Sequence, residues 1–262
     1  MDALRIQLEL KQAIREGHPV LGLFVRTPAL QVVELLGNSG LDFVALDAEH
    51  ASFGTSGLDR CILAGRSVGM PVLVRLRDPQ PAAILQVLDM GAAGIIVPHV
   101  GSANAAKIVL EACRYEKGSR GFSGQHRAAN YGAMDGQKYR KSSDESVIVI
   151  AQIEDEEGFA NVAELAAMRE LDALFVGRAD LAVSIGASGI TDEPVITATS
   201  RIIHAGKKTG MTTGVFLPTT AEIGEFREQG ASLFIISTDH GLLVNAAKAM
   251  TSEFRRATGQ PE

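Results

Sequence analysis

The chain has no tryptophan, and aromatic residues make up only 5% of its 262 residues. Small and aliphatic residues dominate instead, as in tightly packed parallel α/β structures. The formal net charge of −6 argues against a nucleic-acid-binding surface, which needs a basic stripe. We therefore expect one α/β domain spanning residues 1–262 that binds no nucleic acid.

Long apolar runs and cysteine motifs are also lacking. No stretch of about 18 apolar residues occurs, so we expect no membrane span. Residues 1–19 are amphipathic with mixed charge and lack the apolar core and cleavage site of a signal peptide. Cys61 and Cys113 stand alone without CxxC spacing. A reducing, cytoplasmic setting is the simplest interpretation.

Eight apolar runs alternate with amphipathic helical patterns along the chain. The predicted strands are Val20–Val25, Phe43–Leu46, Pro71–Leu76, Gly94–Val100, Ser146–Ile153, Ala173–Val176, Thr213–Leu217 and Leu233–Ser237. Eight strand–helix units in about 250 residues are typical of a (β/α)₈ TIM barrel. The alternative is an open doubly wound sheet, but no GxGxxG follows the first run.

The helical patterns frame this barrel. An amphipathic helix over residues 3–16 precedes the first strand, and an apolar helix, Leu242–Phe254, follows the last one. Between the strands lie the helical patterns Ala29–Ser39, Gly57–Val68, Ala82–Met90, Ala103–Cys113, Phe159–Met168, Pro194–Thr209 and Thr220–Gln229. Residues 118–141 break the rhythm and predict an extended loop with at most one short helix.

Polar groups gather where the predicted strands end. They are Asp47, Glu49, His50, Arg75, Pro98, His99, Gln152, Glu154, Gly177, Arg178, Asp180 and Asp239. The carboxyl ends of barrel strands form one ring around a pocket, so we expect these groups to converge. A single charged strand end could be a solvated turn residue, but a ring with several carboxylates, histidines and arginines is harder to explain that way.

Two carboxylates in this ring, Glu154 and Asp180, follow neighbouring strands and predict a site for a hard divalent cation. Each alone could instead be a first-turn acid of a helix. Arg75 could face developing oxyanion charge, or form a structural ion pair with Asp47 or Glu49. His50 is the natural acid/base candidate, and Asp47 could orient it.

Two other chemistries are excluded. All eight lysines fall on helical or loop patterns, whereas an imine-forming aldolase needs a lysine that closes a buried strand. The nucleophile-elbow motif of serine hydrolases is missing.

Seven segments along nearly the whole chain form a recognisable set. They are FVALDAEHA (43–51), PVLVR (71–75), LDMGAAGIIVPHV (88–100), YEKGSRGF (115–122), IAQIED (150–155), VGRADLAVSIG (176–186) and ISTDHGLL (236–243). In this order and spacing they resemble the HpcH/HpaI aldolase family. The resemblance implies a class II, metal-dependent pyruvate aldolase of the 4-hydroxy-2-oxoheptanedioate or 2-keto-3-deoxy-rhamnonate aldolase type. Such an enzyme converts 4-hydroxy-2-oxo acids to pyruvate plus an aldehyde through a metal-held pyruvate enolate.

The resemblance also implies residue roles. Glu154 and Asp180 would be ligands of Mg²⁺ or Mn²⁺, with Co²⁺ as a further option. Arg75 would contact the keto oxygen of pyruvate. The remaining roles are Asp47 with His50 as the acid/base pair, Gln152 beside the metal-bound ligands, and the N–H groups of Ala179 and Asp180 on the pyruvate carboxylate. Family members are commonly hexamers that exchange the last barrel helix.

Some positions depart from the family pattern, and other functions stay open. Arg178 replaces a proline and His99 replaces a small or apolar residue, which suggests an acceptor aldehyde that carries a carboxylate. A lyase acting on a coenzyme A thioester and a non-catalytic barrel that binds a keto acid are the alternatives. A basic surface for nucleotide phosphates is not evident beyond Arg120 and Arg127.

Overall fold

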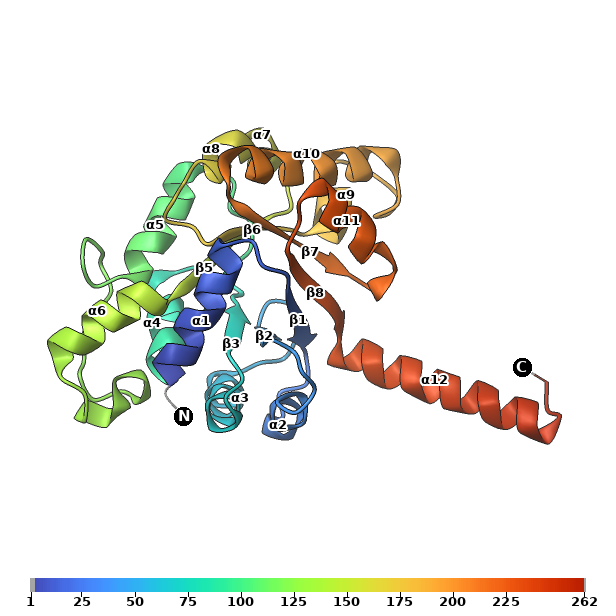
Figure 1. The fold of residues 1–262 in the computed structure, drawn as a ribbon, viewed down its shortest axis with the longest axis horizontal. Coiled ribbons are helices and arrows are strands. Elements are labelled where there is room, and N and C mark those ends of the chain that lie inside the picture. The colour runs from blue at the N-terminus through green and yellow to red at the C-terminus, as the bar shows by residue number, and fades with distance from the viewer. Residues whose placement is uncertain (1–2, 262) are drawn as a thin grey trace.

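Eight parallel strands close into a barrel whose order around the ring follows the sequence (Figure 1). The computed structural model describes residues 3–261, so the two first residues and the last residue of the predicted domain lie outside the described part. The strands are β1 Val20–Val25, β2 Phe43–Asp47, β3 Val72–Arg75, β4 Gly94–Val97, β5 Ile148–Ile153, β6 Ala173–Val176, β7 Thr212–Leu217 and β8 Leu233–Thr238. The predicted (β/α)₈ barrel is confirmed.

The strands are apolar because both of their faces are covered. Every residue of β2 to β6 is buried. One face packs against the surrounding helices, and the other fills the barrel interior, where the rings of Phe24 and Phe175 meet edge to face at 6.4 Å. A packed interior leaves only the strand ends for chemistry.

The N-terminal helix belongs to the core of the barrel. Leu10 and Ile14 of α1 lie in the same buried cluster as the inward-facing strand residues. The hydroxyl group of Thr212, at the start of β7, donates a hydrogen bond to the carbonyl oxygen of Ile14. The helix therefore covers the amino-terminal floor, and the carboxyl ends of the strands remain accessible.

The helices depart from the prediction in three places. Residues 118–141, predicted as a loop, hold the turn η1 and most of α6, whose first turn is capped by Asp135. The pattern Phe159–Met168 is split into α7 and α8 at Asn161, whose backbone leaves helical geometry. A short helix, α9, directly follows β6 and was not predicted. α6 is almost entirely polar and shows no apolar stripe, and α7, α8 and α9 are too short for a clear helical period.

The helices have the following bounds: α1 Ala3–Arg15, α2 Leu30–Leu36, α3 Thr55–Val68, α4 Pro81–Met90, α5 Ala103–Cys113, α6 Gly136–Ser146, α7 Glu156–Ala160, α8 Val162–Ala166, α9 Arg178–Ser184, α10 Glu193–Thr209, α11 Ile223–Gln229 and α12 Asp239–Thr258, with short turns η1 Arg127–Gly132 and η2 Thr220–Glu222.

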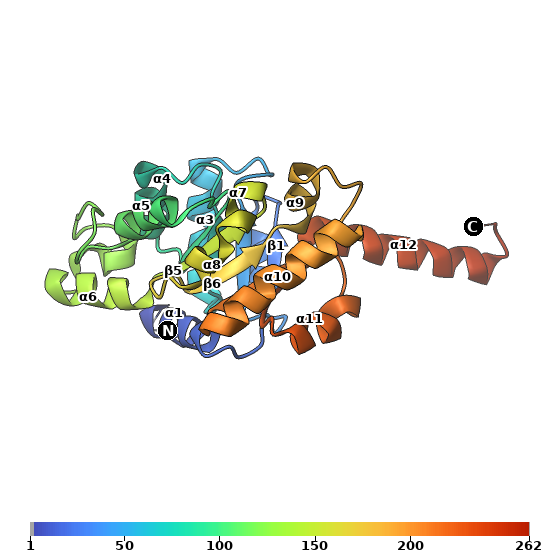
Figure 2. The same cartoon turned by 90° about the horizontal axis from the view of Figure 1, so that it is seen from above.

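The last helix, α12, projects away from the barrel in both views (Figures 1 and 2). None of its described residues is buried. Its apolar side chains, Leu243, Val244, Met250 and Phe254 among them, are exposed. The apolar face of α12 is therefore not covered by any described part of the single chain. None of the described helices is both long and apolar enough to cross a membrane.

Candidate active site

A cavity of about 190 Å³ opens at the carboxyl ends of the strands. Five of the seven predicted site residues line it, namely His50, Arg75, Gln152, Ala179 and Asp180. The other two lie behind this lining: Asp47 binds Arg75, and Glu154 binds Gln152. The predicted convergence of the strand ends therefore brings all seven into one region.

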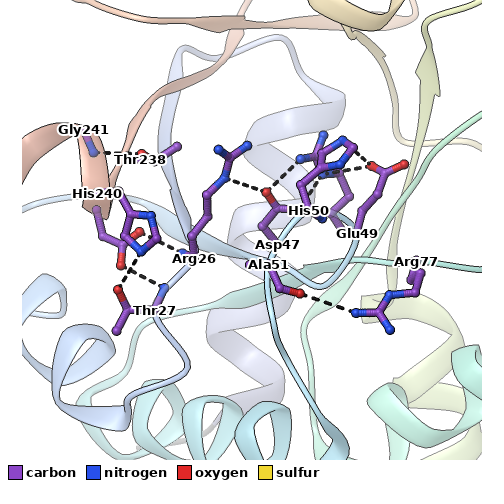
Figure 3. A network of polar contacts seen from close by, with 12 residues as sticks. Arg26, Thr27, Asp47, Glu49, His50, Ala51, Arg77, Thr238, His240 and Gly241 are labelled. Atoms are coloured by element: carbon purple, nitrogen blue, oxygen red, sulfur yellow. Dashed lines mark hydrogen bonds and ion pairs between the residues drawn. The ribbon is translucent and has the colours of Figure 1, made fainter.

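Asp47, the last residue of β2, is fully buried and anchors two arginines (Figure 3). It accepts hydrogen bonds from Arg75 Nε at 3.1 Å, from Arg75 Nη2 at 2.8 Å and from Arg26 Nε at 2.8 Å. Burial alone would raise the pKa of Asp47, but the hydrogen bonds and charge of Arg75 outweigh it and hold that pKa below its usual range. Asp47 therefore stays ionised and fixes both guanidinium groups.

Arg75 is held rigidly between this carboxylate and an aromatic ring. Its guanidinium lies 4.5 Å from the centre of the Phe24 ring, and its Nε lies 3.3 Å from Glu49 Oε2. The side chain is almost completely buried. Its remaining nitrogen, Nη1, has no acceptor among the described residues. One NH₂ group of a fixed cation thus remains available to a ligand in the cavity.

Glu154, directly after β5, is only 1% exposed. Its Oε1 accepts the backbone N–H of His99 at 2.8 Å, and its Oε2 accepts an N–H of Gln152. Burial raises the pKa of Glu154. Gly177 leaves the space that the carboxylate fills, because a Cβ there would lie 2.7 Å from Glu154 Oε2.

Three potential metal ligands meet beside this carboxylate. Ligand atoms of Glu49, His99 and Glu154 all lie within 4.8 Å of one another. Two buried oxygens here, Glu49 Oε2 and Gln152 Oε1, have no hydrogen-bond partner among the described residues. Burial raises the pKa of Glu49, and the nearby charge of Asp180 adds to that effect. A cation would satisfy these oxygens and relieve the cost of gathering carboxylates.

The backbone at His99 supports a functional role for this cluster. His99 has a φ of 53°, in the left-handed region that non-glycine residues seldom adopt. Its Nδ1 lies 3.4 Å from Glu154 Oε1 and its Nε2 lies 3.8 Å from Glu49 Oε1. Strained residues of this kind cluster at binding sites, where the surrounding structure holds them in place.

Asp180, the second predicted metal ligand, lies in the first turn of α9 and lines the same cavity. It is outside the Glu49–His99–Glu154 set. The helix has no side-chain cap at its N-terminus, so the first-turn N–H groups of Ala179 and Asp180 have no helical acceptor. A small anion in the cavity could accept them.

His50 is half exposed at the cavity wall, with its Nε2 3.5 Å from Glu49 Oε2. Asp47 accepts the backbone N–H of His50 at 3.1 Å, whereas no contact joins the carboxylate to the imidazole in the described structure. The carboxylate closest to the ring is therefore Glu49, which the sequence analysis had placed only as an ion-pair partner of Arg75.

Arg178 lines the cavity but is already paired. It forms a two-bond ion pair with Glu222 of η2, at 2.8 and 3.0 Å, and packs over the Phe226 ring. Its side chain is 5% exposed. The idea that Arg178 offers a free positive charge to an acidic acceptor therefore fits poorly with this geometry, because a residue 44 positions away neutralises it.

The residue that sequence reasoning missed is Arg26, which lines the cavity from the end of β1. Asp239, predicted as part of the ring, instead accepts the backbone N–H groups of Arg26 and Thr27 at 2.8 and 3.0 Å. Arg26 could have been found from the sequence, because it directly follows the first apolar run just as Arg75 ends the third.

A larger hollow of about 730 Å³ lies at the opposite, amino-terminal end, between α1 and the loops that follow α5 and α8. Three of its cationic side chains, Lys11, Arg15 and Arg114, are paired with protein groups. Lys11 donates to the carbonyl oxygen of Val147 at 2.6 Å, and Arg15 donates to Asp172 at 2.9 Å. Barrel enzymes place their chemistry at the carboxyl ends of the strands, so the smaller cavity is the candidate site.

Comparisons with known proteins agree with this geometry. The family model described as HpcH/HpaI aldolase/citrate lyase matches residues 21–246. A 2-dehydro-3,6-dideoxy-6-sulfogluconate aldolase of Pseudomonas putida is 32% identical over 90% of this chain and 92% of its own, and a 5-keto-4-deoxy-D-glucarate aldolase of Klebsiella pneumoniae is 31% identical over 85% and 87%.

A solved structure agrees as well. An HpcH/HpaI aldolase/citrate lyase family protein from Burkholderia cenocepacia superposes with a TM-score of 0.89 at 31% identity, covering 94% of this chain and 99% of that one. The resemblance and the fold expected from it are thus both confirmed. The chain belongs to the HpcH/HpaI aldolase/citrate lyase family.

Proposed function

We propose that this protein is a metal-dependent aldolase that cleaves 4-hydroxy-2-oxo acids to pyruvate and an aldehyde, and catalyses the reverse condensation. The observation that carries the proposal is the pairing of opposite charges in one cavity. A guanidinium fixed by buried Asp47 lies 3.3 Å from Glu49, whose carboxylate gathers with His99 and the buried Glu154. The named aldolases among the relatives support the same reaction class.

The donor set suits a divalent cation. Glu154 and Asp180 are the proposed ligands, and Glu49 and His99 lie where they could complete the coordination. Oxygen donors suit Mg²⁺ and Mn²⁺, and an imidazole adds Co²⁺ as an option. When bound, the cation supplies Lewis acidity to the keto oxygen of pyruvate, which is worth several kcal/mol. Glu49 Oε2 and Gln152 Oε1, which accept no hydrogen bond from the described residues, support this assignment.

The protein groups then have separate tasks. Arg75 directs its free Nη1 at the keto oxygen and stabilises the negative charge that develops there. The N–H groups of Ala179 and Asp180 orient the pyruvate carboxylate, and Gln152 fixes Glu154. His50 removes the hydroxyl proton of the substrate in the cleavage direction; the bond between C3 and C4 then breaks, and pyruvate takes up a proton at its methyl carbon.

Exchange of the pyruvate methyl protons with deuterium tests the proposal without knowing the aldehyde. We expect deuterium exchange with Mg²⁺, Mn²⁺ or Co²⁺. The exchange should stop when the ion is removed with a chelator and resume when the ion is restored. A barrel that only binds a keto acid would bind pyruvate without exchange. Absence of exchange with every ion, in a protein shown to be folded, would rule the proposal out.

Helix α12 supports a homo-oligomer, which we propose to be a hexamer in which neighbouring chains exchange this helix. The exposed apolar residues Leu243, Met250 and Phe254 are suited to packing against a second copy. Sedimentation of the wild-type protein and of Phe254→Asp tests this, since the substitution should dissociate the assembly. We place the enzyme in the cytoplasm, where the free, buried Cys61 and Cys113 would stay reduced.

A further inference from the structure

Arg26 is fixed in the cavity wall by contacts at both ends of the residue. Its backbone N–H donates to Asp239 Oδ1 at 2.8 Å, and the backbone N–H of Thr27 donates to the other oxygen of the same carboxylate at 3.0 Å. Its side-chain Nε donates to Asp47 Oδ2 at 2.8 Å. The guanidinium is therefore oriented before any ligand binds, which reduces the entropy lost on binding.

The outer part of this guanidinium is unused. Neither Nη1 nor Nη2 of Arg26 has an acceptor among the described residues, and the side chain is 35% exposed. Two N–H groups that lie side by side on a planar cation match the two oxygens of a carboxylate or sulfonate. An arginine with both Nη groups free beside a cavity thus has the donors to hold such an anion.

The other cations of the cavity do not offer this fork. Arg75 uses Nε and Nη2 on Asp47 and keeps only Nη1 free. Arg178 uses both Nη groups on Glu222. Among the described residues that line the cavity, Arg26 is the arginine with two free Nη groups.

Arg26 lies at the edge of the proposed pyruvate site, because its Nε and Arg75 Nη2 donate to the same oxygen of Asp47. Arg75 ends β3, Glu154 follows β5, and Ala179 and Asp180 follow β6, so pyruvate would lie among these strands. Arg26 follows β1, which lies between β8 and β2 in the closed ring. The side of the cavity near β1 and β7, with Phe24 and Phe216 in its lining, remains for the second substrate.

We propose that Arg26 is a specificity-determining residue that binds the anionic group, carboxylate or sulfonate, of the aldehyde acceptor. This inference rests on the proposed aldolase function. Arg26 contacts the part of the aldehyde that does not react, so its effect falls on the choice of acceptor. Charge-assisted hydrogen bonds from a preoriented arginine favour an acidic acceptor over a neutral one of the same length.

The test compares the wild type with Arg26→Gln, Arg26→Lys and the control Arg178→Gln. The kcat/KM is measured at saturating pyruvate for succinate semialdehyde, for sulfoacetaldehyde and for neutral butanal. We expect Arg26→Gln to lower the ratio of acidic to neutral kcat/KM at least tenfold, and Arg26→Lys to lower it less, because lysine keeps the charge without the fork. Arg178→Gln should leave this ratio within twofold of the wild type.

The ratio separates the outcomes. A fall with succinate semialdehyde alone assigns a carboxylate, a fall with sulfoacetaldehyde alone assigns a sulfonate, and a fall with both assigns a shared oxyanion site. A ratio within twofold of the wild type in Arg26→Gln, or an equal fall in Arg178→Gln, overturns the inference. An equal loss with acidic and neutral acceptors would place Arg26 on pyruvate instead, and would also overturn it.

Two further measurements keep this inference distinct from the proposed function. Deuterium exchange into pyruvate, run without an aldehyde, reports on the proposed function alone. Binding of the unreactive anions succinate and sulfoacetate, measured by calorimetry on the metal-loaded protein, reports on Arg26 without catalysis. We expect the tighter of the two anions to bind at least fivefold more weakly to Arg26→Gln; unchanged binding would contradict the inference even in an active enzyme.

Discussion

The two ends of the barrel differ in how they use their buried charges. At the amino-terminal floor, Asp172 accepts hydrogen bonds from Arg15 and from the backbone of Val149, and Lys11 lies 3.7 Å away. At the carboxyl-terminal end, Glu49 Oε2 and Gln152 Oε1 have no hydrogen-bond partner among the described residues. Buried polar groups that are satisfied contribute to stability, whereas unsatisfied oxygens beside a cavity can accept a cation.

The pKa shifts show the same contrast within the cavity. Asp47 is buried like Glu154, yet two arginines bind it, and its pKa is lowered. Glu154 has no cationic side chain of that kind, and burial raises its pKa. One carboxylate has its counter-charge built into the protein, and the other would gain it from the proposed cation. Each of the following predictions tests one side of this comparison.

The largest effect is expected for Glu154→Gln. The substitution keeps the size of the side chain but removes a proposed metal ligand, so metal-dependent pyruvate exchange should fall by about a thousandfold or more. Calorimetric titration should show the loss of tight Mn²⁺ binding. The melting temperature without metal should not fall, because an uncompensated carboxylate has been removed. Full exchange activity in this variant would contradict the assignment.

Arg75→Gln should reduce turnover by about 10²–10³, in line with the loss of one fixed donor to a developing oxyanion. The substitution also leaves Asp47 with a single arginine, so stability should be measured in parallel. Arg75→Lys separates the two effects, since it keeps a positive charge beside Asp47 without the fork. A Gln variant with reduced stability but wild-type turnover would make Arg75 purely structural.

Asp172→Asn tests the floor. Breaking a buried charge cluster should lower the free energy of unfolding by about 3 kcal/mol, measured by urea denaturation. Pyruvate exchange per folded molecule should be unchanged, since the residue lies at the end away from the cavity. The matched control is Glu9→Gln in the exposed Arg5–Glu9 pair, with an expected change below about 1 kcal/mol. Loss of exchange in folded Asp172→Asn would contradict the division between the two ends.

His99→Leu should change the metal preference. Removal of an imidazole should weaken Co²⁺ binding about tenfold relative to Mg²⁺, because nitrogen ligands favour the later transition metals. Competition calorimetry with both ions measures the ratio directly. His204→Leu, on the exposed surface of α10, is the control. An unchanged ratio would remove His99 from the ligand set.

The smallest effect concerns pH. Since the folded-state pKa of Glu154 is raised above its unfolded value, the folded protein binds more protons in this range. Burial of the charged Glu154 carboxylate therefore costs no folding stability below the unfolded pKa, near 4.5. This loss of stability grows as the pH rises through the folded-state pKa. Without metal, the melting temperature of Glu154→Gln should exceed that of the wild type by a margin that grows above pH 4.5 and levels off above the folded-state pKa. A constant margin would mean that Glu154 is not the titrating group.

Much of the fold could be predicted from the sequence because the strands are continuous apolar runs. All eight predicted runs contain a strand, with ends that differ by up to three residues, as at Gly94–Val100 and β4 Gly94–Val97. The ring of polar strand ends followed from the same pattern, since the barrel places every carboxyl end on one side.

The partners of each side chain could not be predicted in this way. Strand order brings Arg75 and Glu154 to the same end of the barrel, but it does not reveal that Glu222 neutralises Arg178 or that Asp47 binds Arg26. These contacts depend on loop paths and rotamers that the period of a strand does not encode. The role of Glu49, closer to the imidazole of His50 than Asp47 is, was missed for the same reason.

The central claim is that a cation binds between Glu154 and Asp180 at the carboxyl-terminal end of the barrel. Crystals soaked with Mn²⁺ and examined by anomalous diffraction test it most directly. The account predicts one strong peak in the cavity with Glu154 and Asp180 as ligands, and no such peak in Glu154→Gln. A peak that neither carboxylate reaches, or a peak only at the amino-terminal floor, would contradict it.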